Sequence, residues 1–304
     1  MYVSESEVRA VLTYDALIPA IRQALSDYSA GLVIQPPRTI MRAGNADGYR
    51  NGWFATMPVI ASDVMAVKNV TFFPGNSELG LPTHMAVIEL LRRSTGEPLA
   101  VMDGRLITEM RTAAVSAVAL SALAPRGART LGILGSGVQA RSHLEAFRHA
   151  MPGLTEVRIW SRNAANAQRL ADEVAAQAGT IEEAAAADIV LTVTSSTEPI
   201  LKGKWLAHNA LVIAVGATGA TVRELDDLVL NSSFIVAECK AAAERESGDI
   251  ILSGFKVDAE IGAIVAGKVP APIGRRTLFK SVGMAIEDLT AARIVWAARS
   301  KFTN

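Results

Sequence analysis

The chain has 304 residues, half of them hydrophobic, a length that suits about two domains with cores of their own. Lysine plus arginine and aspartate plus glutamate both total 30, so the formal net charge is zero. A neutral chain without a run of basic residues argues against nucleic acid as a partner. The single cysteine, Cys239, excludes an internal disulfide and a cysteine-cluster metal site, and we expect it to fill a core.

The sequence shows no targeting or membrane segment. Residues 1–7 do not combine a basic segment with a following apolar one, as a secretory signal would. No stretch approaches the ~18 uninterrupted apolar residues of a membrane span. We therefore expect a cytoplasmic protein that does not bind a membrane.

The chain begins with a helical pattern and continues as a run of strands. Apolar residues recur at helical spacing over residues 4–25, and we expect Pro19 to break this stretch into two short helices. Strand-like segments bounded by turn-forming residues follow at 38–42, 52–57, 64–70, 85–91 and 99–102. Because no helix separates them, they cannot form a doubly wound sheet, and we predict a separate strand-rich α+β domain.

A second domain is predicted from alternating helices and strands. Residues 105–123 contain no glycine or proline and favour a long helix that leads into it. Strands are expected at 157–160, 188–194, 211–215 and 233–237, with helical segments between them. This alternation predicts an α/β domain with a Rossmann-like parallel sheet.

The predicted parallel sheet lacks room for one strand. Only Gly179 and Thr180 separate a helix at 163–178 from the next helical run, so we expect a sheet shortened at one edge. A helical pattern at 284–299 follows a linker with two prolines and is expected to return to the first domain. We therefore assign residues 1–112 and 275–304 to the first domain and 113–274 to the second.

The second domain opens with a glycine-rich turn, Gly135-Ser136-Gly137-Val138-Gln139-Ala140. The turn follows an apolar strand and precedes a helical pattern, which is the order that a dinucleotide-binding turn requires. Gly135 permits the tight turn, Gly137 lets the backbone approach a pyrophosphate, and Ala140 allows close packing of helix and strand. The phosphates would meet the positive end of the helix dipole.

The end of the second strand indicates which dinucleotide is bound. NAD enzymes commonly place an acid there, whose carboxylate accepts hydrogen bonds from the ribose hydroxyls. Here the strand ends in Trp160-Ser161-Arg162, and Arg162 can donate bidentate hydrogen bonds to a 2′-phosphate. We predict NADPH as the cofactor, with NADH as the alternative. An exposed arginine at a strand end is the structural alternative for Arg162.

Further cofactor contacts are expected where parallel strands end, because ligands of this fold bind at their carboxyl ends. Thr192 and Thr194 end one strand, and Val215 and Gly216 end the next, where a glycine lets the backbone approach the nicotinamide. Thr112, on the long helix, is a further candidate.

Markers in both domains resemble those of the ornithine cyclodeaminase and mu-crystallin family. They are Pro37-Arg38, Val67-Lys68-Asn69, Pro82-Thr83-His84, Glu109-Met110-Arg111-Thr112, the turn at Gly135, Ala214-Val215-Gly216-Ala217 and the segment 281–288. The resemblance covers nearly the whole chain. It implies a dimeric enzyme whose first domain binds a small amino or imino acid against the nicotinamide of a cofactor held by the second. It also implies that Ser281, Val282 and Gly283 close over the nicotinamide ring.

By position, Arg38, Lys68, Thr83 and Arg111 match the substrate-binding residues of that family, and Lys68 is the catalytic candidate. The residue types agree with this assignment. Two arginines can supply forked donors to a carboxylate, and an unpaired ammonium within an apolar strand would be costly.

These assignments have structural alternatives. Lys68 could lie on the exposed face of a half-buried strand, and Arg111 could form a salt bridge with Glu109 or Glu89. We expect His84 to be structural. No histidine pair has the spacing of a metal site with a carboxylate nearby, so no metal is predicted.

One departure from the family bears on the reaction. Its cyclodeaminases carry an aspartate shortly after the Ala-Val-Gly stretch, where this chain has Thr218. A threonine hydroxyl does not ionise near neutral pH, so it cannot take up the proton that amine oxidation and cyclisation require. We expect Glu224, Asp226 and Asp227 to be loop and helix-start residues, although Glu224 could help to order the site.

Hydride transfer to a preformed carbon–nitrogen double bond does not need that aspartate. We therefore predict reduction of 1-pyrroline-2-carboxylate or 1-piperideine-2-carboxylate to L-proline or L-pipecolate with NAD(P)H, as in the ketimine reductases of the family. Arg38 and Arg111 would hold the carboxylate, and Lys68 would bind it or manage the proton on the imine nitrogen. The alternatives are an ornithine cyclodeaminase, an alanine-type dehydrogenase, and a protein that binds NADPH and a small ligand without turnover.

Overall fold

The computed structural model describes residues 2–44 and 51–300, and the chain divides into two compact units. The first unit is Met1–Arg111 with Met284–Asn304, and the second is Thr112–Gly283. The boundary between Arg111 and Thr112 lies one residue before the expected boundary between residues 112 and 113. The chain returns to the first unit at Met284, later than expected, because Thr277–Lys280 still belongs to the sheet of the second unit.

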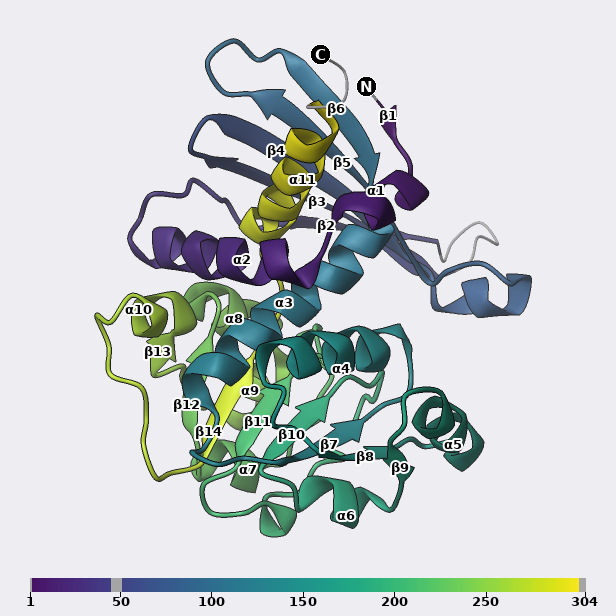
Figure 1. Ribbon diagram of the computed structural model, residues 1–304, viewed down its shortest axis with the longest axis vertical. Coiled ribbons are helices and arrows are strands. Elements are labelled where there is room, and N and C mark those ends of the chain that lie inside the picture. The colour runs from purple at the N-terminus through teal and green to yellow at the C-terminus, as the bar shows by residue number, and fades with distance from the viewer. Residues whose placement is uncertain (1, 45–50, 301–304) are drawn as a thin grey trace. The chain divides into compact units, whose positions relative to one another are not determined.

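A six-stranded sheet forms the centre of the first unit (Figure 1). Its strand order is β1-β6-β5-β4-β3-β2, antiparallel throughout except for the parallel pair of β1 and β6. The strands are β1 (Tyr2–Val3), β2 (Thr39–Ala43), β3 (Gly52–Ala61), β4 (Val64–Phe72), β5 (His84–Arg92) and β6 (Pro98–Asp103). All the strands expected in this part of the chain are present. Sequence reasoning missed β1, because two residues are too few to show a pattern.

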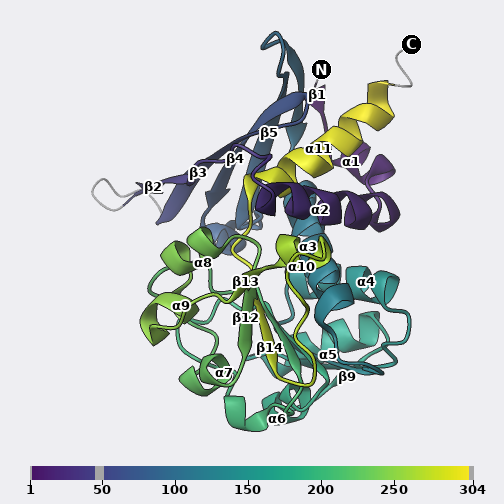
Figure 2. The same ribbon diagram turned by 90° about the vertical axis from the view of Figure 1, so that its left-hand side faces the viewer.

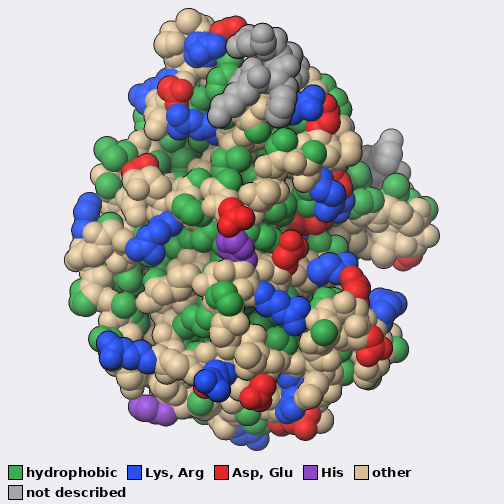
Figure 3. All heavy atoms as spheres, viewed as in Figure 1, with side chains coloured by type: hydrophobic (Ala, Val, Ile, Leu, Met, Phe, Trp, Pro, Cys, Tyr) green, Lys and Arg blue, Asp and Glu red, His purple; other side chains and the backbone are tan. Residues whose placement is uncertain are grey.

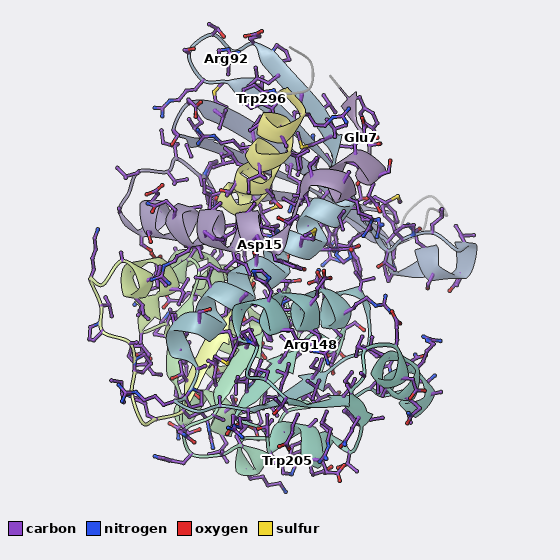
Figure 4. All side chains as sticks on the ribbon, viewed as in Figure 1. Glu7, Asp15, Arg92, Arg148, Trp205 and Trp296 are labelled. Atoms are coloured by element: carbon purple, nitrogen blue, oxygen red, sulfur yellow. The ribbon has the colours of Figure 1, made fainter. Side chains whose placement is uncertain are left out.

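Helices cover one face of this sheet, which we call the inner face. The helical elements are α1 (Glu5–Val11), α2 (Tyr14–Ser29), the start of α3 (Arg105–Leu123), the 3₁₀ turn η1 (Pro74–Leu79) and α11 (Ala285–Ser300). α11 packs on β3, β4, β5 and α2 (Figure 2). Figure 4 labels Trp296 on α11 and Glu7 on α1, and Glu7 accepts a hydrogen bond from Arg299 at 2.5 Å. Two segments far apart in sequence are thereby joined.

Pro19 does not end a helix, contrary to expectation. It lies inside α2, and the break between the N-terminal helices falls at Leu12 and Thr13, the cap residues that flank it. A proline removes one backbone donor. It lies near the start of α2, and the helix continues past it because its apolar face, including Leu17 and Ile21, is fully buried.

The opposite face of the sheet, which we call the outer face, carries exposed apolar side chains among polar ones such as Thr71 and Glu89. The strand register places on it Met41, Met85, Val87 and Val101, with exposed fractions of 48%, 40%, 41% and 36%. The residues that alternate with them on β5, among them Ala86 and Ile88, are buried on the inner face. An exposed apolar surface on a sheet is typical of an interaction surface.

An eight-stranded parallel sheet forms the second unit, in the order β13-β12-β14-β11-β10-β7-β8-β9. The strands are β7 (Thr130–Leu134), β8 (Glu156–Trp160), β9 (Gln177–Ala178), β10 (Ile189–Thr192), β11 (Leu211–Ala214), β12 (Phe234–Ala237), β13 (Ala259–Glu260) and β14 (Thr277–Lys280). Every residue of β10, β11 and β14 is buried, as expected for a parallel sheet covered on both faces.

Helices lie on both sides of the parallel sheet, and in Figure 2 α8 and α9 lie to one side of the strands and α4 to the other. They are α4 (Val138–Ala150), α5 (Ala164–Glu173), α6 (Ile181–Ala185), α7 (Asp227–Asn231), α8 (Lys240–Glu246), α9 (Gly248–Ser253) and α10 (Ile261–Val265), with a 3₁₀ turn η2 (Gly203–Trp205). The predicted α/β fold with a Rossmann-like sheet is confirmed.

Three strands of this sheet differ from expectation, one of them the edge strand β13, which was not predicted. The edge strand β9 lies within the stretch predicted as helix up to residue 178, because Ala175 adopts a positive φ of 52° and ends the helical region after α5. The edge is short, as expected, but the strand exists. β14 was not predicted at all, and it lies between β11 and β12 in the sheet.

α3 is the one helix in the described part of the chain that is long and apolar enough to cross a membrane. Of its most apolar window, 72% is buried within the protein, which is typical of a helix in a protein core. On the surface, Figure 3 shows Lys and Arg side chains interspersed with Asp and Glu side chains. That face therefore has no large area of a single charge that would attract a polyanion.

Candidate active site

The turn after β7 has the backbone geometry that only glycine tolerates. Gly135 has a φ of +129°, and a Cβ atom there would lie 2.7 Å from the carbonyl oxygen of Val193. Its N–H donates to the carbonyl of Trp160 at 2.8 Å, which ties the turn to the end of β8. Any side chain at this position would push the turn away from β8 and β10.

The residues that follow fit a dinucleotide. Gly137 is the N-cap of α4, no side chain caps it, and a Cβ atom there would meet nothing within 4 Å. Gln139 carries a buried side-chain oxygen that has no hydrogen-bond partner among the described residues. An open helix N-terminus suits a phosphate, and a buried acceptor suits a hydroxyl such as those of a ribose. Val138, beside them, is half exposed.

Ser161 and Arg162 extend this surface from the end of β8. The hydroxyl of Ser136, in the glycine turn, donates to Ser161 Oγ at 2.9 Å. Arg162 is exposed, and Asn163 after it caps α5 by accepting the N–H of Ala165 at 3.0 Å. The structure therefore brings Ser161 to the glycine turn and leaves the adjacent guanidinium in solvent, without a carboxylate at this strand end.

The carboxyl ends of the central strands form one row. The register pairs Trp160 with Leu134, Leu134 with Thr192, Thr192 with Ala214, and Ala214 with Lys280. Predicted cofactor residues lie within two positions after this row on each strand, with Ser161, Gly135, Thr194, Val215 and Ser281 among them. Residues from five strands thus lie at one edge of the sheet, where ligands of this fold bind. Thr112 lies buried on α3, and its contact with the cofactor stays a prediction.

A buried carboxylate holds two of these strand ends together. Glu224 is fully buried, and its Oε1 accepts both the N–H and the hydroxyl of Thr194 at 2.7 Å. Its Oε2 accepts the Thr192 hydroxyl at 2.8 Å and the N–H groups of Gly216 and Ala217 at 2.9 and 3.3 Å. With both oxygens occupied as acceptors, the side chain functions as a carboxylate that fixes the ends of β10 and β11.

Glu224 is itself held by a buried ion pair. Asp249 accepts the N–H groups of Glu224 and Leu225 at 2.9 and 3.0 Å through one oxygen. Its other oxygen lies 2.9 Å from the ammonium of Lys280, and both side chains are fully buried. The turn that carries Glu224 is therefore anchored to β14.

A second carboxylate acts in the same way at the end of β14. Glu238, fully buried after β12, accepts the hydroxyl of Ser281 and the N–H of Val282 at 2.9 Å. The N–H of Gly283 also donates to it, at 3.4 Å. The segment Ser281 to Gly283, assigned to the cofactor by resemblance, is thus fixed by an acid from the neighbouring strand.

In the first unit, Lys68 lies on the inner face of β4 and is 2% exposed. Its Nζ is 2.7 Å from Oδ2 of Asp288 on α11. Burial, which penalises the charged form, lowers the pKa of Lys68 to about 8 against the opposing effect of the Asp288 charge. The alternative of an exposed strand face for Lys68 is therefore wrong.

Arg111 lies beside Lys68 in the same cluster of charges. Its NH1 is 2.5 Å from Glu287 and its Nε is 3.0 Å from Oδ1 of Asp288. Both of these acids come from α11, whereas the alternatives considered from the sequence were Glu109 and Glu89. Glu109 pairs with Arg105 instead, at 2.5 Å.

Arg38 and His84 lie within electrostatic range of the same cations. Arg38 is half-buried before β2, and its charge lowers the pKa of Lys68 further. His84 is exposed on one side, yet its pKa falls to about 4, first through desolvation and then through the charges of Lys68 and Arg111. It is neutral at pH 7, and its ring lies 4.5 Å from that of Phe72. This packing agrees with the structural role expected for it.

Other sequence-predicted residues take structural places. Thr83 is half-buried before β5, its carbonyl accepts the N–H of Phe73 at 2.9 Å, and its contact with substrate stays a prediction. Asp226 caps α7 by accepting the N–H of Val229 at 3.0 Å, as a helix-start residue does. No group of three metal-ligating side chains occurs within residues 2–44 and 51–300. Cys239 is buried, as expected.

The acids that hold these groups were missed by sequence reasoning. Glu287 and Asp288 stand in the first turn of α11, where acidic residues are common because they favour the helix dipole. One feature of the sequence could have indicated them. The two acids lie among apolar residues of the same helix, such as Ile286 and Leu289, which are buried. Two adjacent acids in such surroundings require buried cations as partners.

The sequence pattern of the ornithine cyclodeaminase/mu-crystallin family matches residues 1–301 of the chain. The chain belongs to this family. Among its members, the ketimine reductase mu-crystallin of Mus musculus is 41% identical over 305 aligned residues, which cover 97% of this chain and 96% of the mouse protein. The family membership expected from the markers is confirmed.

Solved structures of related proteins have the same fold. The Delta(1)-pyrroline-2-carboxylate reductase of Thermococcus litoralis, in complex with NADH and L-proline, superposes with a TM-score of 0.93 at 32% identity, covering 100% of this chain and 98% of that one. An archaeal alanine dehydrogenase dimer with bound NAD gives a TM-score of 0.93 at 29% identity, covering 99% and 97%. The likeness extends over both units of the chain.

Proposed function

We propose that this protein is a reductase that uses NAD(P)H to convert 1-pyrroline-2-carboxylate or 1-piperideine-2-carboxylate to L-proline or L-pipecolate, as a step of proline or pipecolate metabolism. The observation that carries the proposal is the buried pair of Lys68 and Arg111. An ammonium beside a guanidinium suits a carboxylate, and the pair occurs in a chain that also has a dinucleotide turn. Relatives named for ketimine and pyrroline-2-carboxylate reduction support the choice of substrate.

The reaction adds a hydride to the imine carbon and a proton to the imine nitrogen. When bound, a reduced nicotinamide would supply the hydride. Arg38 and Arg111 would bind and orient the carboxylate. Lys68, with a pKa of about 8, is protonated at pH 7. Its ammonium would bind the carboxylate or hold the proton for the imine nitrogen.

The residue at position 218, a threonine, argues against cyclodeamination as the reaction. It is exposed in the turn after β11, where the cyclodeaminases of the family carry an acid. Glu224, in the same turn, cannot replace that acid, because five donors occupy its two oxygens. Neither Thr218 nor Glu224 can therefore accept the proton of an amine in this turn.

NADPH is the cofactor that we propose, although the solved relatives hold NADH or NAD. Support comes from the exposed Arg162 at the end of β8 and from the absence of an acid at this strand end. A guanidinium there favours a 2′-phosphate, and a carboxylate would have repelled it.

The assembly that we propose is a homodimer that pairs through the outer face of the six-stranded sheet. The exposed apolar residues of that face support the proposal, as does the dimer formed by the alanine dehydrogenase relative. We also propose a cytoplasmic location, which suits a chain whose single cysteine is buried and not in a disulfide.

The function is tested with the purified protein and a panel of substrates. NADPH and NADH oxidation is followed with the two cyclic imines and with pyruvate plus ammonia, and ammonia release is measured with L-ornithine. We expect turnover of at least one cyclic imine, with NADPH preferred. Ammonia release from ornithine without imine reduction would reject the proposal in favour of a cyclodeaminase. Turnover of pyruvate alone would favour an alanine-type dehydrogenase, and NADPH binding without any turnover would favour a binding protein.

A further inference from the structure

Asp288 is placed to organise both cations of the first unit. It stands in the first turn of α11, is 1% exposed, and uses its two oxygens for different partners. Oδ2 lies 2.7 Å from the ammonium of Lys68 on β4, and Oδ1 lies 3.0 Å from Nε of Arg111 on α3. One carboxylate therefore bridges a cation on β4 and a cation on α3.

The charged groups that act on Lys68 come from several elements. Arg111 on α3 and Arg38 before β2 are cations, Glu287 and Asp288 on α11 are anions, and His84 on β5 is neutral at pH 7. Lys68 and Arg111 are thus two like charges in a buried place, and the carboxylate of Asp288 contacts both of them.

We propose that Asp288 is a positioning residue, which holds the Lys68 ammonium beside the Arg111 guanidinium so that both cations can act on the substrate. The inference rests on the proposed function and adds to it a residue that acts through Lys68 and Arg111. Glu287 contacts Arg111 through its Oε2.

The electrostatics of Lys68 support the role of Asp288. Burial lowers the pKa of Lys68, and the nearby negative charge of Asp288 is the largest influence that raises it again. Removing that charge would lower the pKa of Lys68 below its present value of about 8. Lys68 would then lose its proton at a lower pH, together with its fixed position.

The first experiment compares Asp288→Asn with Glu287→Gln, two variants that each remove one charge from α11. The pH dependence of kcat/KM is measured with the cyclic imine that the wild type reduces best. Both variants should raise KM about tenfold, the effect of losing one charge-assisted contact to Arg111. Only Asp288→Asn should move the alkaline limb of the profile to lower pH. If kcat/KM falls at the same alkaline pH in both variants and in the wild type, the proposal is overturned.

A third variant separates the charge of Asp288 from its position and guards against misfolding. Asp288→Glu keeps the negative charge but displaces it by one methylene, so the alkaline limb should stay near that of the wild type while KM rises. Thermal unfolding of all variants is measured alongside. If Asp288→Asn does not fold, Asp288→Glu alone tests the positioning role. A wild-type KM in Asp288→Glu would overturn that role, because it would show that the carboxylate oxygens of residue 288 need not lie where they lie in the wild type.

A binding measurement without turnover distinguishes a failure of this inference from a failure of the proposed function. Calorimetry measures the affinity of the wild type and of Asp288→Asn for pyrrole-2-carboxylate, a planar monocarboxylate, at pH 7 and pH 9. The wild type should bind it less tightly at pH 9, and Asp288→Asn should bind it at least tenfold more weakly than the wild type at pH 7, a loss of about 1.4 kcal/mol. This pattern in a protein that reduces no imine would support the inference and reject the proposed function. Wild-type affinity in Asp288→Asn would overturn the inference.

Discussion

Lys68 sets the pH dependence expected of the proposed reaction. Its pKa is lowered to about 8 because burial penalises the ammonium. The ammonium is present below this pH and is lost as the pH rises through it. We therefore expect kcat/KM for a cyclic imine to be steady near neutrality and to fall above about pH 8, the pKa of the group.

This prediction is checked by pH–rate profiles of the wild type, Lys68→Met and Lys256→Met. Lys68→Met should lower kcat/KM by about 10²–10⁴-fold and abolish the alkaline limb, since it removes the titrating group. Lys256, which is 77% exposed, is the matched control and should leave the profile unchanged. A wild-type profile that stays flat to pH 10, or a limb that survives in Lys68→Met, would contradict the role of Lys68.

Arg162 governs the cofactor preference in our proposal. In Arg162→Ala the guanidinium that would bind a 2′-phosphate is gone, so we expect KM for NADPH to rise about 10- to 100-fold, the effect of losing a charged hydrogen bond. KM for NADH should change little, because NADH has no phosphate at that position. Steady-state kinetics with both cofactors checks this, with Arg169→Ala on the exposed side of α5 as the control. Equal losses for both cofactors would show that Arg162 does not read the phosphate.

At the scale of residues, the sequence could point to the cations of the candidate site but not to their partners. Lys68 and Arg111 could be recognised because charge in an apolar strand or helix is unusual and because both match family positions. Glu287 lies 176 residues from Arg111, and no local spacing connects them. Only the packing of α11 on the inner face brings the acids to the cations.

At the scale of elements, the ends of β10 and β11 are joined through Gly216. A Cβ atom there would lie 2.2 Å from the carbonyl oxygen of Thr194 and 2.4 Å from Oε1 of Glu224. Both atoms are held by the buried Glu224 network and cannot move aside. Gly216→Ala should therefore separate the two strand ends and displace the residues expected to contact the cofactor.

We expect Gly216→Ala to weaken NADPH binding at least tenfold and to lower the melting temperature by several degrees, the usual effect of about 1–3 kcal/mol of overpacking. Fluorescence titration with NADPH and thermal unfolding measure the two effects. Gly153→Ala is the control, since a Cβ atom at Gly153 would meet nothing within 4 Å. A Gly216→Ala protein with the affinity and stability of the wild type would show that the turn has room.

The elements themselves were predictable where periodicity and turn residues agree. The strands of the first unit alternate between buried and exposed side chains, so their pattern is visible in the sequence. β9 was hidden by alanine-rich sequence with high helix propensity, which pairing with β8 overrides. β14 was missed because the prolines before it suggested a linker and its four residues give too short a pattern.

At the scale of the whole molecule, we predict that the outer face forms the dimer interface. Val87→Lys places a charge among the exposed apolar residues of that face, and burying it in an interface would be costly. We expect the wild type to sediment as a dimer and Val87→Lys to sediment as a monomer. Ile251→Lys, at a residue of α9 that is 38% exposed, is the control and should remain dimeric. A dimeric Val87→Lys protein would place the interface elsewhere, and a monomeric wild type would reject the dimer.

The position of α11 in the chain has a consequence for how the protein is made. Lys68 and Arg111 leave the ribosome long before Glu287 and Asp288, which supply their counter-charges. The second unit is one continuous segment, Thr112–Gly283, and can fold as soon as it emerges. The first unit receives α11, and with it the carboxylates that contact Lys68 and Arg111, only when residue 288 has been synthesised. We therefore expect the second unit to fold before the first, the reverse of the usual N-to-C order on the ribosome.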